Sequence, residues 1–216
     1  IPALLSNLLL SIPLVARSTT TPNRSIALVG SGPSLAQTWV DLSKYETILS
    51  CSRAHDRLLE FGIIPTYHID IDGGPHKAGL ITPQPQTIYY LHYGVHSNYW
   101  DKISGFKNTV ISYRGQQAGD TAIKLAYNLG YRDLHFYGYD CSGQGNRTIR
   151  FLGQDYLIDE NQLGSLGCFE QMCESLPDLN ITIHGDGLLR HFYKARIDAN
   201  FRDLSRTESE TTLIES

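Results

Sequence analysis

Two carboxylates, Asp70 and Asp72, alternate with isoleucines in HIDIDGG (residues 68–74) and stand directly before a glycine pair. In a strand, side chains two residues apart lie on the same side, so both carboxylates could reach one point at the strand end. Mg²⁺ prefers such oxygen ligands and usually bridges to phosphates. Two like charges side by side cost energy without a cation between them. With His76 and Lys77 just beyond, the pattern favours a metal–phosphate site, and a plain edge strand is the alternative.

A turn after the apolar run 26–29 is the second candidate for phosphate binding, and its members are Gly30, Ser31, Gly32, Pro33 and Ser34. Glycine lets the backbone approach a phosphate closely, and free amide groups would point at it. The turn is not a Walker A motif, because no Gly-Lys-Ser/Thr follows. It also lacks the last glycine of G-x-G-x-x-G, since residue 35 is Leu. An ordinary structural turn remains the alternative.

Two positions near expected helix starts could contact an anion. Arg53 follows an apolar run in SCSRAHD and could bind a phosphate or a nucleobase, although a surface ion pair with Asp56 explains it equally well. Gly119 and Asp120 open the segment GDTAIKLAYNLGY (119–131), whose helical N-terminus would attract an anionic ligand. Asp120 or Thr121 would in any case serve as the cap of that helix.

Two later positions follow apolar runs of strand type. Asp140 ends such a run in YGYDCSG, where its carboxylate could bind a ribose hydroxyl or a metal, or could hold the next loop in place. His184 stands with Asp186 in IHGDGLL. Because the pKa of a free histidine lies near neutrality, His184 could act as a general base, with a purely structural role as the alternative.

The elements that must position these residues follow from the hydrophobic pattern. Apolar runs rich in β-branched and aromatic residues predict strands at 26–29, 46–52, 65–72, 86–94, 108–115, 133–140 and 180–187. Helical spacing predicts helices at 54–63 and 119–131, and a further helical segment before the last strand. Strands that alternate with helices are typical of an α/β domain with a mainly parallel sheet. Ligands bind beyond the carboxyl ends of such strands, where the polar stretches would meet.

Composition limits the alternatives. The 216 residues include 41% hydrophobic and 19% charged residues, which suits one α/β domain at 25–200, an N-terminal arm or helix at 1–24 and a polar tail at 201–216. The net charge of −4 gives no general attraction to nucleic acid or anionic membranes. The N-terminal apolar stretch is too short and too interrupted to span a membrane. Four cysteines without a CxxC pair indicate reduced thiols in a cytoplasmic protein.

Three stretches in order, VGSGPSL, SCSRAHDRLLEFGIIPTYHIDIDGGPHKAG and GQQAGDTAIKLAYNLGYRDLHFYGYDCS, resemble the 6-hydroxymethylpterin diphosphokinase MptE-like family over about residues 25–143. The resemblance implies a Rossmann-like sheet flanked by helices. It also implies transfer of diphosphate from ATP to a pterin alcohol with Mg²⁺, as in the archaeal namesakes. The family's acidic strand end corresponds to residues 70–73 and is similar to that of thiamine pyrophosphokinases. The same broad family includes motility accessory factors, and its Gly-Pro-Ser-Leu turn looks like that of sialyltransferases that use CMP-sugars.

The leading expectation is therefore a Mg²⁺-dependent transferase that uses ATP or another nucleotide and a small-molecule acceptor. Asp70 and Asp72 would hold Mg²⁺, and the amides of residues 30–32 would line the phosphates. Arg53 or Lys77 would neutralise charge on the transferred group.

In the same expectation, Asp140 would contact the acceptor or the ribose. One alternative is a glycosyltransferase that uses a nucleotide-activated sugar, with His184 as its base. Another is a non-catalytic nucleotide-binding protein. Each of the three is compatible with a homo-oligomer.

Overall fold

The computed structural model describes residues 24–143, 145–176 and 178–199. The N-terminal arm expected at 1–24, except for Arg24, and the tail expected at 201–216 lie outside the described residues. Arg24 leads directly into the first strand, and its guanidinium lies over the ring of Tyr131 at 4.8 Å from the ring centroid.

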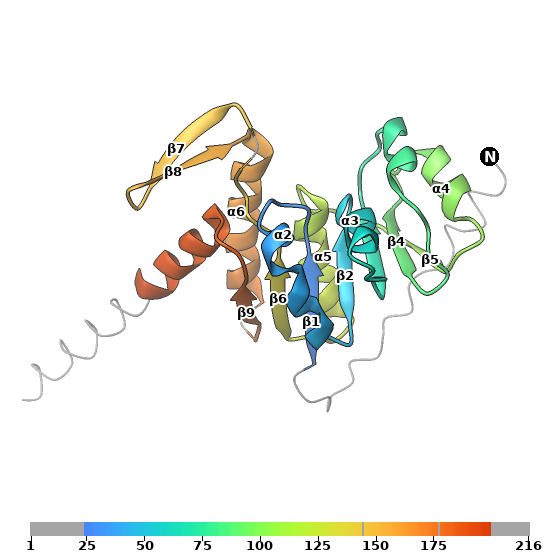
Figure 1. Cartoon of the computed structure of the whole chain (residues 1–216), viewed down its shortest axis with the longest axis horizontal. Coiled ribbons are helices and arrows are strands. Elements are labelled where there is room, and N and C mark those ends of the chain that lie inside the picture. The colour runs from blue at the N-terminus through green and yellow to red at the C-terminus, as the bar shows by residue number, and fades with distance from the viewer. Residues whose placement is uncertain (1–23, 144, 177, 200–216) are drawn as a thin grey trace, which may run out of the picture.

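A seven-stranded parallel sheet forms the centre of the molecule (Figure 1). The spatial order is β5-β4-β3-β2-β1-β6-β9, and all neighbouring strands run in the same direction. The strands are β1 (Ser25–Val29), β2 (Ile48–Cys51), β3 (Tyr67–Asp70), β4 (Ile88–His92), β5 (Asn108–Ile111), β6 (Asp133–Tyr137) and β9 (Asn180–Ile183). Each lies within or overlaps one of the seven strands predicted from the sequence. The predicted α/β fold with a mainly parallel, Rossmann-like sheet is confirmed.

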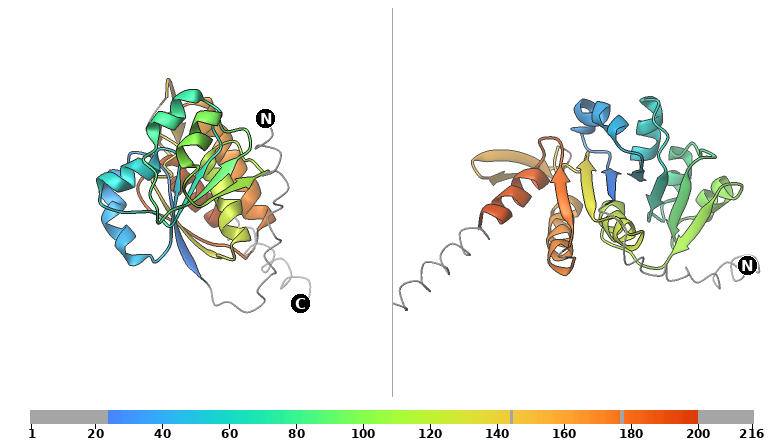
Figure 2. Two further views of the ribbon diagram at one scale, coloured as in Figure 1. Left: turned by 90° about the vertical axis from the view of Figure 1, so that its right-hand side faces the viewer. Right: turned by 90° about the horizontal axis from the view of Figure 1, so that it is seen from below.

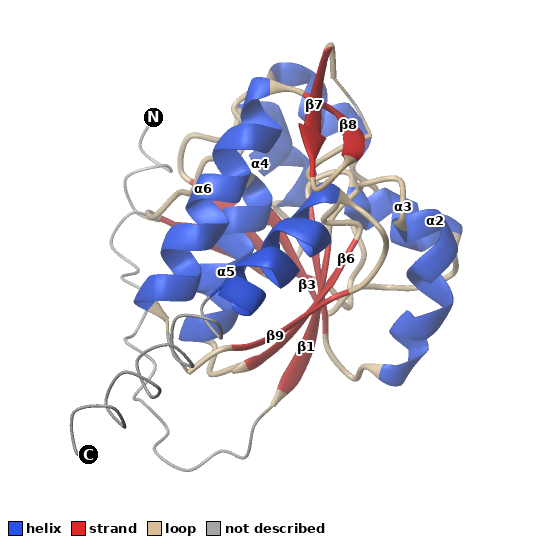
Figure 3. Ribbon diagram, turned by 90° about the vertical axis from the view of Figure 1, so that its left-hand side faces the viewer, coloured by secondary structure: helices blue, strands red, loops and turns tan. Residues whose placement is uncertain are grey.

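Helices cover both faces of the sheet (Figures 2 and 3). On one face lie α5 (Ala118–Asn128) and α6 (Glu160–Ser175). On the opposite face, α2 (Leu35–Thr38), the 3₁₀ helix η1 (Trp39–Lys44) and α3 (Ala54–Glu60) cover the middle strands. Beside them, the 3₁₀ helix η2 (Pro75–Leu80) and α4 (Ser97–Ile103) cover the β4 end of the sheet. The chain therefore folds as three layers.

Side-chain alternation along β1 explains why its sequence is apolar throughout. Ile26 and Leu28 pack in the core beneath α5 and α6, whereas Ala27 and Val29 pack in the core beneath α2 and α3. All four side chains are fully buried. A central strand of a parallel sheet is covered on both faces, so it reads as a continuous apolar run.

A β-hairpin after β6 was not predicted from the sequence. It consists of β7 (Arg147–Phe151) and β8 (Gln154–Ile158), which pair antiparallel and project from the body of the molecule (Figure 1). Leu152 and Gly153 form its two-residue turn, and both have positive φ angles, as turns of this length require. Tyr156 and Ile158 anchor the hairpin in the core beneath α5 and α6. A helix at residues 188–199 follows β9 and was also not predicted.

All four cysteines lie in the described part of the chain, and none of them is in a disulfide. In the same residues, no helix combines the length and apolar character that crossing a bilayer requires.

Candidate functional site

A cavity of about 510 Å³ opens at the carboxyl edge of the sheet, where the strand order changes direction between β1 and β6. In open α/β sheets this switch point is the usual ligand site. The wall contains residues from the loops after β1, β2, β3 and β6 and from the N-terminal ends of α5 and α6. Residues 30–33, Gly119, Asp120 and Asp140, all predicted as ligand-binding, belong to it.

The glycine turn after β1 lies directly against the loop after β6. Gly30 N–H donates to the carbonyl of Tyr137 at 2.8 Å, and Gly32 N–H donates to the carbonyl of Gly138 at 2.9 Å. A Cβ atom at Gly32 would lie 2.6 Å from the Gly138 carbonyl oxygen, so only glycine allows this approach. The expectation that these two amides are free for a phosphate is therefore wrong, because loop packing uses both of them.

The side chain of Asp140 also joins these two loops. Its carboxylate Oδ2 accepts a 2.9 Å hydrogen bond from the amide of Ser34, and the side chain is buried. The backbone carbonyl of Asp140 also accepts hydrogen bonds from Leu189 N–H at 3.1 Å and from the Ser142 hydroxyl at 3.2 Å. One predicted role of the Asp140 carboxylate was to hold the next loop in place, but the segment that this carboxylate contacts is the turn after β1. Its side chain also belongs to the cavity wall.

The Asp70 carboxylate fixes the backbone and side chains that lie next to the cavity. Its Oδ1 accepts hydrogen bonds from the amides of Ile71 at 2.8 Å and Asp72 at 3.1 Å, and from the Ser52 hydroxyl at 3.1 Å. The side chain is 3% exposed and does not line the cavity, and burial raises its pKa. Ser52 has a φ of +47°, so Asp70 holds a residue that is in a strained conformation.

Of the two aspartates in HIDIDGG, Asp72 is the one that lines the cavity. Its Oδ2 lies 3.1 Å from the ammonium of Lys77, its Oδ1 accepts from Gly74 N–H at 2.8 Å, and its side chain is 43% exposed. Burial raises the pKa of Asp72, but the Gly74 amide and Lys77 outweigh burial, so the pKa lies below its usual value. The expectation that Asp70 and Asp72 share one side of a strand is wrong, because β3 ends at Asp70 and only Asp72 lines the cavity.

Within the described residues, no group of three or more His, Cys, Asp or Glu side chains converges to hold a metal ion. Mg²⁺ usually takes only one or two protein carboxylates, with phosphate oxygens and water as its other ligands. Asp72 fits that requirement, because its carboxylate is partly exposed at the cavity wall. The residues therefore fit a magnesium ion that arrives with a phosphate-bearing ligand, and they do not form a protein-only metal cage.

The N-terminus of α5 forms another part of the wall. The helix begins at Ala118 with Gln117 as its N-cap residue, and the Asp120 carboxylate accepts from Gln117 N–H at 2.9 Å. The expectation that Asp120 or Thr121 occupies the N-cap position is wrong, because the N-cap residue lies three residues before Asp120 and four before Thr121. Asp120 belongs to the first turn of the helix, and its side chain contacts the N-cap residue. Burial raises the pKa of Asp120 to about 6, although hydrogen bonds to its charged form act in the opposite direction.

Besides Ser34 and Asp70, two more predicted residues do not line this cavity. His184 Nε2 lies 3.2 Å from His135 Nδ1, and its ring stacks on Tyr137 at 4.1 Å between centroids. Tyr137 packs in the core beneath α2 and α3, so His184 lies on that face of the sheet. Arg53 is exposed immediately before α3, and the Asp56 carboxylate instead contacts the ring of His55 and the amide of Thr82.

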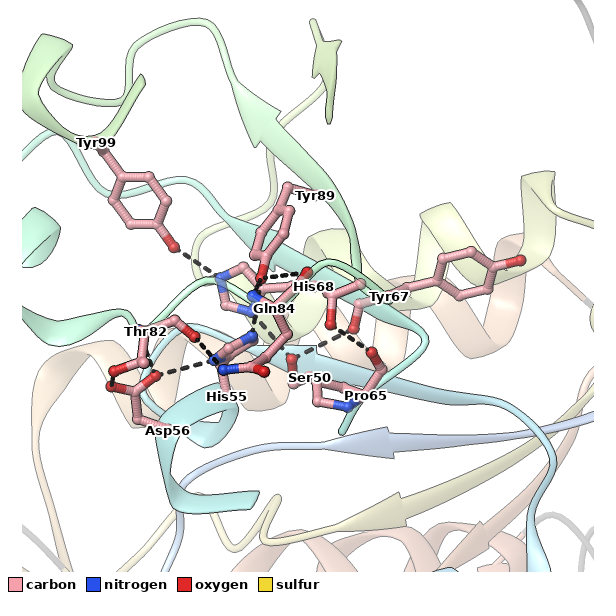
Figure 4. A network of polar contacts seen from close by, with 11 residues as sticks. Ser50, His55, Asp56, Pro65, Tyr67, His68, Thr82, Gln84, Tyr89 and Tyr99 are labelled. Carbon is pink, nitrogen blue, oxygen red and sulfur yellow. Dashed lines mark hydrogen bonds and ion pairs between the residues drawn. The ribbon is translucent and has the colours of Figure 1, made fainter. Parts of the chain in front are cut away.

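The histidine that opens HIDIDGG does not line the cavity either, and it belongs to a buried polar network (Figure 4). His68 contacts the Ser50 hydroxyl at 3.0 Å and the Tyr99 hydroxyl at 2.8 Å. Neighbouring His55 contacts the Tyr89 hydroxyl at 3.2 Å. Burial lowers the pKa of both histidines. The network therefore holds neutral imidazoles that join β2, β3 and β4 to α3 and α4.

Sequence reasoning missed two contributions to the wall. Arg114 follows β5, and Asp159 and Gln162 come from the start of α6. The second contribution had a recognisable signal: an aspartate followed three residues later by glutamine is a capping box. Here Asp159 Oδ1 accepts from Gln162 N–H at 2.8 Å, and Gln162 Oε1 accepts from Asp159 N–H at 3.0 Å.

The chain is similar to several known proteins. A family model described as 6-hydroxymethylpterin diphosphokinase MptE-like matches residues 5–146. The solved structure of MAf glycosyltransferase from Magnetospirillum magneticum AMB-1 has a TM-score of 0.64 and 18% identity, over 79% of this chain and 33% of that chain. A probable thiamine pyrophosphokinase from Staphylococcus saprophyticus subsp. saprophyticus has a TM-score of 0.46 and 18% identity, over 75% of this chain and 65% of that chain.

This chain thus spans about a third of the length of the glycosyltransferase. At 18% identity, the similarity to that structure establishes a shared fold and nothing more. A search of curated proteins gave no match.

Proposed function

The chain belongs to the 6-hydroxymethylpterin diphosphokinase MptE-like family, and from this premise we propose that it transfers diphosphate from ATP to a small alcohol with the help of Mg²⁺. The observation that carries the proposal is the ion pair between Asp72 and Lys77 in the wall of the switch-point cavity. It offers a carboxylate for a metal and an ammonium for a phosphate at one place. The cavity volume, about 510 Å³, is within the range of sites for small ligands.

In the proposed reaction the alcohol oxygen attacks the β-phosphorus of ATP. The bond between that phosphorus and the oxygen that bridges to the α-phosphorus breaks, so AMP leaves with the bridging oxygen and the alcohol gains the diphosphate. Mg²⁺, when bound, neutralises negative charge on the phosphates. Asp72 would hold it, and Lys77 and Arg114 would contact phosphate oxygens from the wall. Positioning and electrostatics supply most of the catalysis in such reactions.

The phosphates would lie against the N-terminus of α5. The first-turn amides of a helix have no partner within the helix, and they attract anions together with the helix dipole. Ala118 and Gly119 bring this first turn to the cavity wall. The turn after β1 would contribute its shape and the exposed residue Ser31, because the Gly30 and Gly32 amides donate to the loop after β6.

A thermal-shift titration tests the nucleotide site directly, because a ligand that binds only the folded state raises the melting temperature. We expect ATP with Mg²⁺ to raise it and ATP without Mg²⁺ to raise it less. Asp72→Ala should lose the magnesium-dependent part of the shift. Asp101→Ala, a matched exposed carboxylate on α4, should retain it. An equal shift in Asp72→Ala would rule out the proposed metal ligand.

The transfer itself is tested by incubating the protein with ATP and 6-hydroxymethylpterin and measuring AMP. Acceptor-dependent AMP formation supports the diphosphokinase. A metal-independent shift with CMP, and no AMP from ATP, would support a glycosyltransferase that uses a nucleotide-activated sugar. A rise in melting temperature with a nucleotide, without any turnover, would support a non-catalytic nucleotide-binding protein.

A further inference from the structure

A second cavity, of about 620 Å³, lies between α5, α6 and the loop after β5. Its lining differs in character from that of the first cavity. Tyr113, Met172 and Leu176 supply apolar surface, and Gln171 supplies a side-chain amide. The Lys124 ammonium lies 5.2 Å from the centroid of the Tyr113 ring, so a cation is held at the apolar wall. A flat ring with polar edges fits this combination of an aromatic side chain, a thioether, an amide and an ammonium group.

The two cavities share a wall made of Arg114, Gln116 and Asp120. Asp120 is 5% exposed, and its carboxylate is fixed by the 2.9 Å hydrogen bond from Gln117 N–H. The loop after β5 passes so close that a Cβ atom on Gly115 would lie 2.5 Å from the Cβ of Asp120. A carboxylate with a fixed position therefore stands between a cavity suited to a nucleotide and a cavity suited to an aromatic ring.

We infer that the cavity between α5 and α6 binds the acceptor, a bicyclic heteroaromatic alcohol of the pterin type, with its hydroxyl directed at Asp120. The inference rests on the proposed function, because it places the second substrate of that reaction in the cavity between α5 and α6. The ring would pack on Tyr113 and Met172, and its polar edge would face Gln171 and Lys124. The hydroxyl would then approach the nucleotide cavity across the shared wall.

This placement gives Asp120 a part in the chemistry. As the acceptor oxygen forms its bond to the β-phosphorus, its proton passes to the Asp120 carboxylate, and AMP leaves from the opposite side. A general base works best when its pKa is near the working pH. Burial raises the pKa of Asp120 to about 6, closer to neutrality than that of an exposed aspartate. Charged and titratable groups that face it are Cys51, Tyr139, Cys141 and Arg114.

Cys168 allows acceptor binding to be measured without turnover, because it lines the second cavity and not the first. The protein would be treated with N-ethylmaleimide, alone, with ATP and Mg²⁺, or with 6-hydroxymethylpterin, and alkylation of the Cys168 peptide followed by mass spectrometry. We expect the pterin to slow alkylation at least about fivefold and ATP to leave it unchanged. Cys173 on the same helix lies outside the lining residues and serves as the internal control.

Pterin fluorescence reports binding independently. If the pterin binds but Cys168 is alkylated at its original rate, the acceptor lies elsewhere and the inference is wrong. If the pterin fails to bind while ATP still raises the melting temperature, the acceptor assignment is wrong and the nucleotide site stands. If ATP gives no shift, the proposed function itself fails.

Two variants test the roles of individual residues. Lys124→Ala should raise the KM for the pterin about tenfold, the effect of losing one hydrogen bond to a charged group, while the ATP-induced shift stays the same. Lys107→Ala, a matched exposed lysine between α4 and β5, should leave both unchanged. Asp120→Asn keeps an oxygen for Gln117 N–H and should lower kcat about 10²-fold or more, with the pterin still protecting Cys168. A normal kcat in Asp120→Asn would show that Asp120 is not the base.

Discussion

The amide of Ser34 donates a 2.9 Å hydrogen bond to the buried carboxylate of Asp140, and this contact joins the loop after β1 to the loop after β6. The two loops belong to the strands between which the sheet changes direction, and they form adjoining parts of the cavity wall. The site is therefore built on a loop-to-loop contact more than 100 residues apart in sequence.

Asp140→Ala removes the acceptor of the Ser34 amide. We expect a loss of about 1–3 kcal/mol in the free energy of unfolding, because a buried donor is left unpaired. Asp140→Asn retains an acceptor oxygen and should lose less. Urea denaturation of the three proteins measures both differences. If Asp140→Ala is as stable as the wild type, the contact contributes nothing to stability.

Gly32→Ala should destabilise the protein through a steric clash. A Cβ atom there would lie 2.3 Å from Asp140 Oδ2 and 2.6 Å from the Gly138 carbonyl, and the carbonyl belongs to the backbone. Overpacking of this kind costs about 1–3 kcal/mol, and weaker nucleotide binding should accompany it. Gly167→Ala is the matched control, because its Cβ would meet no atom within 4 Å and it lies within α6. Thermal unfolding should show the control unchanged or more stable, since alanine favours helix.

The strands and the position of the cavity could be predicted from the sequence, because each strand carries its own apolar run and parallel strands bring their carboxyl ends to one edge. The partners of individual side chains could not. Asp70 accepts from Ser52 at the end of another strand, and β3 ends before Asp72. A pattern of alternating residues holds only while the strand continues.

The position of His184 was unpredictable for a related reason. Ile183 lies beside Phe136 in the sheet, so the next residue, His184, falls on the opposite face with Tyr137. Alternation shows that neighbours point to opposite faces but not which face holds the site. The glycines at 30 and 32 were predicted to let the backbone approach a phosphate, whereas the group that they approach in the structure is the loop after β6.

Asp70 and Asp72 should behave differently when each is replaced by alanine. Asp70→Ala leaves the Ile71 and Asp72 amides and the Ser52 hydroxyl without their shared acceptor, so we expect a loss of at least about 2 kcal/mol of stability. Asp72→Ala removes a partly exposed side chain and should change stability by less than about 0.5 kcal/mol. Urea denaturation distinguishes them, and equal losses would contradict these separate roles.

A fall in pH should lower the free energy of unfolding through the buried network around His68. Burial holds the pKa of His68 well below 6.5, and burial also lowers the pKa of His55 despite the opposing effect of Asp56. Each imidazole is therefore neutral when folded but takes up a proton more readily when unfolded. Its contribution to stability is complete above pH 6.5 and falls as the pH drops below 6.5 toward the folded-state pKa.

Other groups oppose this trend, so the total stability does not report it alone. The pKa of Asp120 is about 6 in the folded state, which makes its contribution rise as the pH falls from 6 toward 4. A comparison with His68→Gln isolates the histidine, because glutamine keeps a donor and an acceptor but does not titrate in this range. We expect the stability advantage of the wild type over His68→Gln to shrink by about 1 kcal/mol between pH 7 and pH 5.5, which is about one pH unit of linkage below 6.5. A difference that stays constant over this range would show that His68 does not resist protonation in the folded protein.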